Sequence, residues 1–385
     1  LYICDNGNRR VRKVSPAYGG IISTVAGNGI AGFSGDGFEA VNAQIDGVVD
    51  IAIDQKGNLF LSDQGNHRIR KVSPDGIITT IAGTGIAGYN GDNLAATNAQ
   101  LNIPEGICVD KNGSIYISDV GNNRIRCIDT MGIITTIVGN GVAGYSFDGV
   151  PSTSASLNYA SCIRFDKSGV LYFSDNNRIR KIGALGELIT IAGNGIAGNM
   201  GDGGPATAAS IGISAFCIDS AGNIYVADGG EHVVRQIRNN GIISRFAGTG
   251  IGGYYGDGGN PLHAKLNSCQ GISVAQDGNI YIGDVGNNRI RMITSNLSAI
   301  TDQKVNISSF EIFPNPANNM ITFKLPDSYD RITDGQLFSN DGCLLATFPI
   351  HPKCPTQLML NYPTGVYIIT TTINSVIIAK TFTIY

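Results

Sequence analysis

The sequence is poor in several residues on which whole classes of protein depend. Its 385 residues include no tryptophan, 13 prolines and only 15 % charged residues, whereas charged residues make up about 25 % of an average globular domain. Lys and Arg number 27 and Asp and Glu number 30, so the net charge is 27 − 30 = −3. A protein that binds nucleic acid irrespective of sequence needs a basic surface, so we expect no nucleic-acid partner. No run approaches the roughly 18 apolar residues of a membrane span, so we expect no span.

Metal ligands and reactive thiols are also sparse. The four histidines lie far apart without an H-E-x-x-H spacing, and the eight cysteines include no C-x-x-C pair. These absences argue against a His-based metalloenzyme, a zinc site and a disulfide-dense scaffold. No cysteine lies beside a candidate catalytic base, so we interpret the cysteines mostly as small core residues. We therefore predict no catalytic residue and no required cofactor.

Glycine is abundant, with 52 residues, and an internal repeat accounts for it. The segment N-L-F-L-S-D-Q-G-N-H-R-I-R-K-V at residues 58–72 has counterparts at 1–14, 114–128, 170–182, 223–237 and 279–293. Each copy contains one aspartate that we call the anchor aspartate, and successive anchors are 58, 56, 56, 53 and 56 residues apart. The six anchors are Asp5, Asp63, Asp119, Asp175, Asp228 and Asp284.

A full copy contains four short apolar runs, separated by turns rich in Gly, Asn and Asp. In one copy the runs cover residues 50–54, 59–63, 68–72 and 77–83, and their alternation is typical of β-strands. Four strands in each repeat, without a helical period between them, predict radially arranged four-stranded blades, that is, a β-propeller. A β-sandwich with evenly spaced turns is the alternative, but it predicts no such self-similarity.

The residues of the repeat, as well as its spacing, resemble the NHL repeat family. The shared phrases are G-N-x-Y-[I/V]-x-D-x-x-x-x-R-I-R-x-I, G-I-I-T-T-[I/V]-A-G-x-G and G-D-G-x-x-A. The resemblance implies a six-bladed propeller, which we assign to residues 1–302. The second and third runs occur six times, but the first and fourth only five times. We interpret this as a truncated opening blade, in line with a start lacking methionine and signal peptide, with residues 297–305 as a weak candidate closing strand.

The antiparallel topology places the second-to-third turns and the long blade-to-blade connections on one face, where we expect function. The connections cover residues 27–37, 83–93, 139–149, 193–203 and 248–258, and each contains an aspartate. Carboxylates there allow a weak calcium site. We favour a structural role, in which an aspartate caps a turn or pairs with a following arginine, as in Asp63/Arg68. The connection aspartates are Asp36, Asp92, Asp148, Asp202 and Asp257.

The connections also share an aromatic position. An exposed ring could stack on a sugar or meet a partner protein, because tyrosine combines apolar area with a polar group. The favoured alternative is that each ring packs beneath its own connection as a local core. The position is held by Phe33, Tyr89, Tyr145 and Tyr254, with Asn199 in the remaining copy.

Broken symmetry gives a more specific hypothesis, because a single ligand needs unlike residues around one site. Where other copies have a small residue in the innermost strand, such as Ala52, the fourth copy has Arg164, and its second-to-third turn is two residues shorter. A ligand contact and a solvated channel residue are equal alternatives for this arginine. We hypothesise that the asymmetric side of the binding face is marked by Arg164, Asn199, Glu231 and His232.

After about residue 302 the repeat stops. Short alternating runs at 320–325, 336–338, 365–371 and 377–384 predict a small Ig-like β-sandwich over residues 303–385. This segment resembles the C-terminal type A sorting domain of the type IX secretion system, with F-P-N-P-A, L-F-S-N-D-G and P-T-G-V-Y in the family's order. The residues that carry the resemblance are Phe313, Pro314, Asn315, Pro316, Gly342, Gly365, Val366, Tyr367 and Lys380.

The resemblance of the tail implies export across the periplasm and outer membrane of a Bacteroidota-type cell, with the secretion machinery as a partner. We therefore expect a secreted or cell-surface propeller that binds an unknown protein or glycan, or acts as a scaffold, and is not an enzyme. The alternative is a metal-dependent, lactonase- or lyase-like enzyme with an axial site. At the aligned inner position, however, the sequence offers a poor set of metal ligands, namely Ala52, Cys108, Arg164, Cys217 and Ser273.

Overall fold

The structure is a computed structural model that describes residues 1–15 and 20–294, together with strands between residues 311 and 384. The chain divides into two compact units. The first unit comprises Leu1–Asp257 and Pro261–Ser295, and the second comprises Gly258–Asn260 and Asn296–Tyr385. None of the helical segments in the described residues has the length and apolar character to traverse a bilayer.

In its described residues the first unit consists of six antiparallel sheets, which we call blades one to six. The innermost-to-outermost order follows the chain. Blade one contains β1 (Tyr2–Asp5), β2 (Arg10–Val14) and β3 (Ile22–Ala26), and blade two contains β4 (Val48–Ile53), β5 (Leu59–Asp63), β6 (Arg68–Val72) and β7 (Ile78–Ala82). Blade three contains β9 (Pro104–Val109), β10 (Ile115–Asp119), β11 (Arg124–Ile128) and β12 (Ile133–Val138), with β8 (Leu94–Ala95) at its edge, and blade four contains β13 (Ile163–Phe165), β14 (Leu171–Ser174), β15 (Ile179–Ile182) and β16 (Leu188–Ala192). Blade five contains β17 (Ala215–Ile218), β18 (Ile224–Asp228), β19 (Val233–Ile237) and β20 (Ile243–Ala247), and blade six contains β21 (Cys269–Val274), β22 (Ile280–Asp284) and β23 (Arg289–Ile293).

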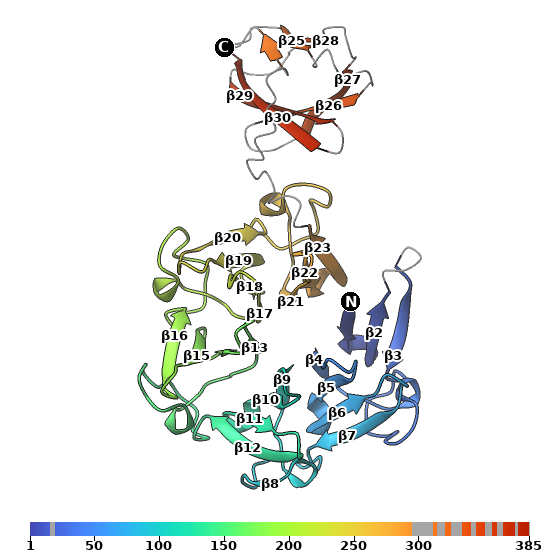
Figure 1. Cartoon of the computed structure of the whole chain (residues 1–385), viewed down its shortest axis with the longest axis vertical. Coiled ribbons are helices and arrows are strands. Elements are labelled where there is room, and N and C mark those ends of the chain that lie inside the picture. Colours follow the sequence, from blue (N-terminus) through green and yellow to red (C-terminus); the bar gives the residue numbers. More distant parts are fainter. Residues whose placement is uncertain are drawn as a thin grey trace. The chain divides into compact units, whose positions relative to one another are not determined.

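The blades are arranged around a common axis, as a propeller requires (Figure 1). Neighbouring blades pack through their innermost strands, with β4 against β9, β9 against β13, β13 against β17 and β17 against β21. The predicted six-bladed propeller is confirmed, and the sandwich alternative for these residues is wrong. Blades one and six show three strands each among the described residues, as the repeat count predicted. The proposed closing strand at 297–305 and the boundary at 302/303 lie outside the described residues.

Glycine is required where each outermost strand ends. Gly83, which follows β7, has φ of 91°, in the left-handed region that favours glycine. A Cβ at this position would collide with the backbone carbonyl oxygen of His67 in the adjacent turn. Gly27, Gly139, Gly193 and Gly248 occupy the same position and face the same collision. The glycine excess therefore reflects close backbone approach between turn and connection.

Short 3-10 turns lie on the same side of the blades as the long connections. Asn66, in the turn after β5, donates from Nδ2 to the carbonyl oxygen of Gly32 in the connection at 2.7 Å, which confirms the predicted shared face. The turns after second strands are η1 (Asn6–Asn8), η4 (Gln64–Asn66), η6 (Val120–Asn122) and η10 (Val285–Asn287). Those in the connections are η3 (Ala40–Asn42), η5 (Ala96–Asn98), η7 (Ser152–Ser154), η8 (Ala206–Ala208) and η9 (Pro261–His263).

The connections that enter blades two to five also pair with the outermost strand of the blade that they enter. In blade two, Gly37 N–H donates to Ile78 O at 2.8 Å, and Ile78 N–H donates to Phe38 O at 3.0 Å. Blades three, four and five repeat this pairing at Ile134, Leu188 and Ile243. The outer edge of these blades is therefore occupied by the preceding part of the chain, a feature that the sequence analysis did not predict.

The second unit contains two antiparallel sheets. One has the order β24 (Glu311–Phe313), β25 (Met320–Lys324), β28 (Thr356–Met359), and the other β27 (Leu344–Ile350), β26 (Thr333–Ser339), β29 (Gly365–Ile373), β30 (Val376–Ile384). The four strands predicted from sequence coincide with β25, β26, β29 and β30. Packing of these sheets as an Ig-like sandwich stays a prediction. Of the proposed sorting residues, Pro314, Asn315, Pro316 and Gly342 lie outside the described residues.

Candidate functional site

One arginine with little or no exposed side chain ties each of blades two to six to the connection that precedes it. In blade two the guanidinium of Arg70 on β6 is fully buried and contacts Asp63 Oδ2 at 3.3 Å and Asp36 Oδ1 at 2.7 Å. Asp63 is the anchor at the end of β5, and Asp36 belongs to the connection from blade one. Blades three, four and six repeat the arrangement with Arg126, Arg180 and Arg291. The repeated charges thus hold the fold together.

The predicted pairing of the anchor aspartate with the arginine five residues later is wrong. Asp63 pairs with Arg70, whereas the guanidinium of Arg68 lies over the ring of Phe33, 3.7 Å from its centroid. The predicted turn cap is present, because Asp63 accepts a hydrogen bond from Asn66 Nδ2 at 2.9 Å. Arg68 donates instead to the carbonyl oxygens of Asn66 at 3.1 Å and Thr84 at 2.7 Å.

The aromatic residues of the connections all take part in such stacking. Their centroids lie 3.7 to 4.0 Å from an arginine guanidinium, although the side chains stay 37 to 48 % exposed. Because a guanidinium covers one face of each ring, the predicted role of the ring as a local core beneath its connection is supported. The exposed remainder of each ring leaves room for contact with a partner. In blade five Asn199 replaces the ring and Val233 replaces the arginine, so both partners are exchanged together. The four rings are Phe33, Tyr89, Tyr145 and Tyr254.

All five connection aspartates face an arginine. Asp202, in the copy without a ring, contacts Arg235 at 2.8 Å, and the other four make the equivalent ion pair. No group of three or more His, Cys, Asp or Glu side chains suited to a metal ion occurs in the described part of the chain. A calcium ion would have to compete with each guanidinium, and calcium at these positions stays an untested prediction.

The four residues proposed to mark the asymmetric side have separate neighbours. The Nδ1 of His232, a residue with φ of 56°, accepts a hydrogen bond from Ser268 N–H at 3.0 Å. Glu231 donates its backbone N–H to the anchor Asp228 at 3.3 Å. Within the described residues no hydrogen bond or ion pair joins any two of these four. A joint role of Arg164, Asn199, Glu231 and His232 in ligand binding stays a prediction.

Arg164 forms an ion pair that links two blades which are not neighbours. Its Nη1 contacts Asp50 Oδ2 at 2.8 Å and its Nη2 contacts Asp50 Oδ1 at 3.1 Å, joining β13 of blade four to β4 of blade two. Asp50 also accepts from the backbone N–H of Ile107 at 3.0 Å. Burial lowers the pKa of Arg164, but the charge and hydrogen bond of Asp50, together with Cys162 and Cys108, raise it overall. The innermost strands therefore carry a paired, fully charged guanidinium.

Four cysteines on the inner strands interact with this charge. Burial raises the pKa of each thiol, and the guanidinium of Arg164 offsets the rise only in part, so that the pKa of Cys217 is about 12. These thiols are protonated at neutral pH and are poor nucleophiles. Three of them are also buried side chains, as the sequence predicted. The four are Cys4, Cys108, Cys162 and Cys217.

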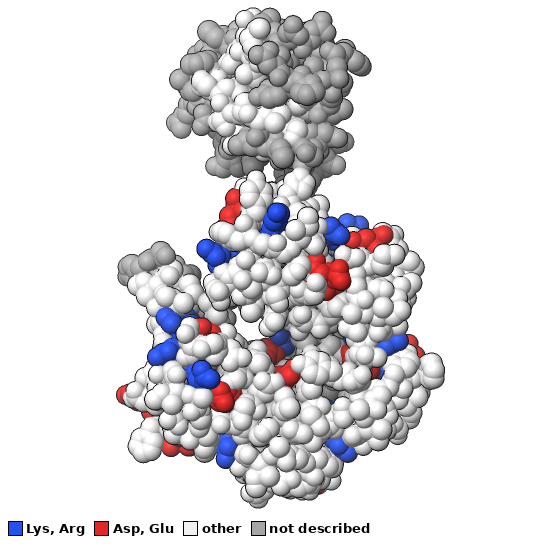
Figure 2. All heavy atoms as spheres, turned by 180° about the vertical axis from the view of Figure 1, so that it is seen from behind, with Lys and Arg blue, Asp and Glu red and all other residues white. Residues whose placement is uncertain are grey.

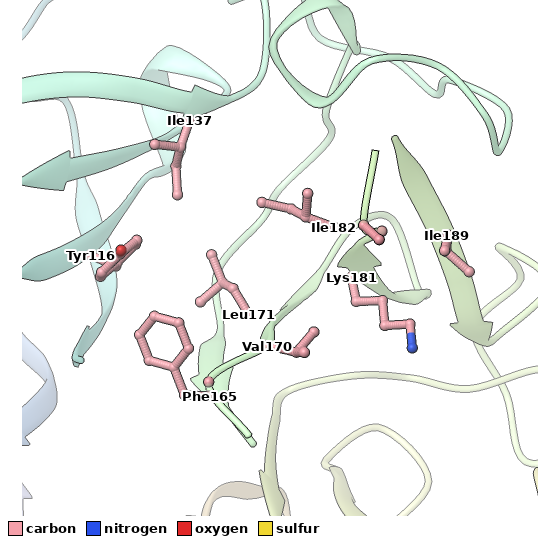
Figure 3. A pocket seen from close by; sticks show the side chains of 11 residues that line it. Tyr116, Ile137, Phe165, Val170, Leu171, Lys181, Ile182 and Ile189 are labelled. Carbon is pink, nitrogen blue, oxygen red and sulfur yellow. The ribbon is translucent and has the colours of Figure 1, made fainter. Parts of the chain in front are cut away.

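A cavity of about 610 Å³ lies between blades three and four (Figure 3). Tyr116 and Ile137 of blade three face Phe165 and Leu171 of blade four, and the two aromatic rings meet edge to face with centroids 4.9 Å apart. Lys181 is the charged side chain in the lining. The lining residues, all of them described, include no carboxylate and no histidine, so this cavity lacks a pair for acid–base catalysis.

A second cavity, of about 220 Å³, lies at the shortened turn of blade four and is lined mainly by polar residues. Sequence reasoning noted the short turn but missed Tyr159 and Glu105 beside it. It also missed Asp50, because the copies were compared at a single inner position. Two residues earlier, Asp50 stands where other copies have Gly106, Cys162, Ala215 and Gly271, and that comparison would have found it.

Family models agree with the fold. The teneurin NHL domain matches residues 85–146, and the NHL repeat matches residues 266–291. The first unit is therefore a β-propeller built from NHL repeats.

Curated relatives extend over much of the same region. Human Teneurin-4 is 30 % identical over 288 residues, which cover 65 % of this chain and 10 % of that protein. Mouse Teneurin-1 is 28 % identical over 289 residues, with coverage of 64 % and 10 %. The chain thus spans only a tenth of these relatives. Among solved structures, an auxiliary nutrient binding protein from Bacteroides thetaiotaomicron aligns with a TM-score of 0.53 and 17 % identity, covering 76 % of this chain and 65 % of that one. This likeness shows the propeller fold alone.

Proposed function

We propose that this protein is a secreted or cell-surface β-propeller that binds a partner or acts as a scaffold, and that it is not an enzyme. The observation that carries the proposal is the ion pair between the innermost strands. A metal-dependent propeller enzyme needs several unlike oxygen or nitrogen ligands at its axis. Here Arg164 brings a positive charge to the inner strands, and Asp50 is already bound to it at 2.8 and 3.1 Å.

The connections offer a surface for a protein or glycan partner. At one repeat position all five connections expose an aliphatic side chain, with exposed fractions of 57 to 64 %. Repeated apolar exposure on a rigid scaffold favours contact with a partner. Figure 2 shows acidic and basic side chains interspersed on the face in view, without a basic patch for nucleic acid. The exposed residues are Ile30, Ile86, Val142, Ile196 and Ile251.

Metal content of the purified full chain tests this proposal. After dialysis against calcium and zinc, elemental analysis should find no ion in stoichiometric amount. The matched variant is Asp50→Asn, which removes the carboxylate that is bound to Arg164 between the innermost strands. One ion per wild-type chain that is lost in Asp50→Asn would overturn the proposal and favour the lactonase- or lyase-like alternative.

The second unit supports the proposed export by the type IX secretion system. The G-V-Y motif opens β29, where Tyr367 is buried, and Lys380 lies on β30 opposite Ile369. We propose that these strands form the Ig-like sorting domain. The test is to express the full chain behind a signal peptide in a host with this secretion system and in the same host lacking its translocon. The chain should reach the surface or medium only in the first host, and equal export from both would refute the route.

A further inference from the structure

The shortened turn of blade four changes the local structure of the repeat. In blades two, three and six, four residues separate the anchor aspartate from the next arginine, whereas blade four has only Asn176 and Asn177. In these three blades an asparagine of the turn bridges the anchor and the carbonyl of the connection, as Asn66, Asn122 and Asn287 do. Blade four lacks that bridge. A cavity of about 220 Å³ lies there instead, about the volume of seven liquid waters.

Uncharged amide groups line the cavity. Asn176 and Asn177 both have left-handed backbones, with φ of 47° and 57°, a conformation that asparagine tolerates better than most residues. Their side-chain amides form no hydrogen bond within the described residues. Each amide offers two donors and an acceptor. The remaining lining residues are Asn158, Tyr159, Ser174 and Ile213, so no charged side chain lines the cavity.

Tyr159 places an aromatic ring at the edge of this cavity. The residue is 60 % exposed and has φ of 56°, a strained backbone for a large side chain. Its hydroxyl donates to Glu105 Oε1 at 3.1 Å, and the same oxygen accepts from Gln64 Nε2 at 2.8 Å. Burial raises the pKa of Glu105, although these two hydrogen bonds lower it. The ring is therefore fixed at its hydroxyl while much of the side chain stays open to solvent.

The left-handed backbone belongs to the repeat, but the exposed ring does not. Gly47, Ile103 and Ser268 occupy the same position in other copies and also have positive φ, between 52° and 67°. Only in the copy with the short turn does this position carry an aromatic residue. The ring and the cavity therefore occur together, where the symmetry of the propeller is broken.

We infer that this cavity binds one neutral saccharide unit, either as a free sugar or as the end of a glycan chain. A sugar ring presents C–H groups that can pack on the Tyr159 ring, and hydroxyl groups that can pair with the amides of Asn176 and Asn177. The neighbouring Glu105 disfavours an acidic ligand. The inference rests on the proposed binding function and specifies the ligand class.

Saturation-transfer NMR on the full chain tests the inference. The probes are glucose, galactose, mannose and N-acetylglucosamine at millimolar concentration, with lactose and chitobiose to separate chain ends from free sugars. At least one probe should receive saturation from the wild type. Asn177→Ala should weaken its binding about tenfold, which corresponds to about 1.4 kcal/mol. Asn123→Ala, at the equivalent left-handed position of blade three, is the matched control and should leave binding unchanged.

A turn graft gives a sharper variant. Replacing Asn176 and Asn177 with the four residues of the blade-three turn, residues 120–123, restores the usual turn length and should abolish binding. If the graft does not fold, Tyr159→Gly tests the inference instead and should also abolish binding. Glycine accepts the left-handed backbone, so only the ring is lost. Ile103→Gly is its control.

Two results would overturn the inference. One is the absence of saturation transfer from the wild type to any of the six probes. The other is binding that persists in the folded graft or in Tyr159→Gly. Either result would refute saccharide binding at this cavity but not the proposed non-enzymatic role, because the metal content tests that role separately.

Discussion

Charged residues in this propeller are few but deeply placed. Arg70, Arg126, Arg180 and Arg235 are among the largest fully buried side chains. A buried charge is tolerated only when it is paired and hydrogen-bonded, and each of these guanidinium groups contacts one or two carboxylates. Removing the arginine leaves the fully buried anchor without its counter-charge, so the anchor and its arginine should act as a unit.

Arg126→Met should therefore be strongly destabilising. The methionine fills much of the space, but Asp119 and Asp92 lose their partner. We expect the free energy of unfolding to fall by about 3–5 kcal/mol, the usual cost of leaving a buried charge unpaired. Urea unfolding measures it. Adding Asp119→Asn should recover part of the loss, and a loss below about 1 kcal/mol, typical of a surface pair, would contradict the prediction.

The anchor Asp228 should give stability an unusual pH dependence. Burial raises its pKa from 3.8 to about 6, although hydrogen bonds from Gly212 and Glu231 lower it. A raised pKa means that the folded state binds this proton more tightly, so stability is lost as pH rises from about 4 to about 6. Relative to wild type, Asp228→Asn should gain up to about 3 kcal/mol across this range. Urea unfolding at several pH values measures the difference, and parallel pH profiles would argue against it.

At the scale of elements, the connections are the variable part of each repeat, and their residues change in pairs. Four connections stack an aromatic ring under an arginine. In the fifth copy Asn199 replaces the ring and Val233 replaces the arginine. Restoring the pair tests whether the two positions are coupled. Asn199→Tyr with Val233→Arg should be more stable than the two single changes predict, by about 0.5–1 kcal/mol. A double-mutant cycle by urea unfolding measures this coupling, and strict additivity would mean that the rings contribute no stability.

The sequence predicted the strands well and the side-chain contacts less well. Repeat spacing and turn residues placed the strands of blades two to five, because strand alternation and turn glycines are local properties. The predicted partner of Asp63 was wrong, because spacing along two strands does not show that Arg68 donates to backbone carbonyl groups instead. The cavity at Asn177 was missed, because a deletion in a turn reveals a symmetry break but not the space that it leaves.

At the scale of the whole molecule, the pair of Arg164 with Asp50 spans 114 residues of sequence. It holds blades two and four together from inside, whereas the packing of β4 on β9, β9 on β13, β13 on β17 and β17 on β21 joins neighbouring blades. Arg164→Met should lower the free energy of unfolding by about 2 kcal/mol, as expected for hydrogen bonds to a charged group. Amide exchange should rise most in β4 and β13. Arg238→Met, at an exposed turn, is the control, and equal effects of the two changes would contradict a role for the pair.

The architecture itself was predictable because it is repeated. Six copies of one pattern specify six sheets, and each copy gives independent support to the others. A single departure, such as Arg164 among small residues, is visible against that background, but its partner lies in another copy and at another position. Sequence comparison between copies therefore finds the unusual residue before it finds its contact.

The pairing of the connections with the outer edges of blades two to five has a consequence for how the chain folds. The strand that would otherwise present a bare edge in blades two to five meets a segment made earlier in the chain. Because the chain is synthesised from its N-terminus, the edge partner of each of these blades is made before the blade itself. Folding can then proceed in the direction of synthesis, one blade at a time, with little exposure of the unpaired strand edges through which sheets aggregate.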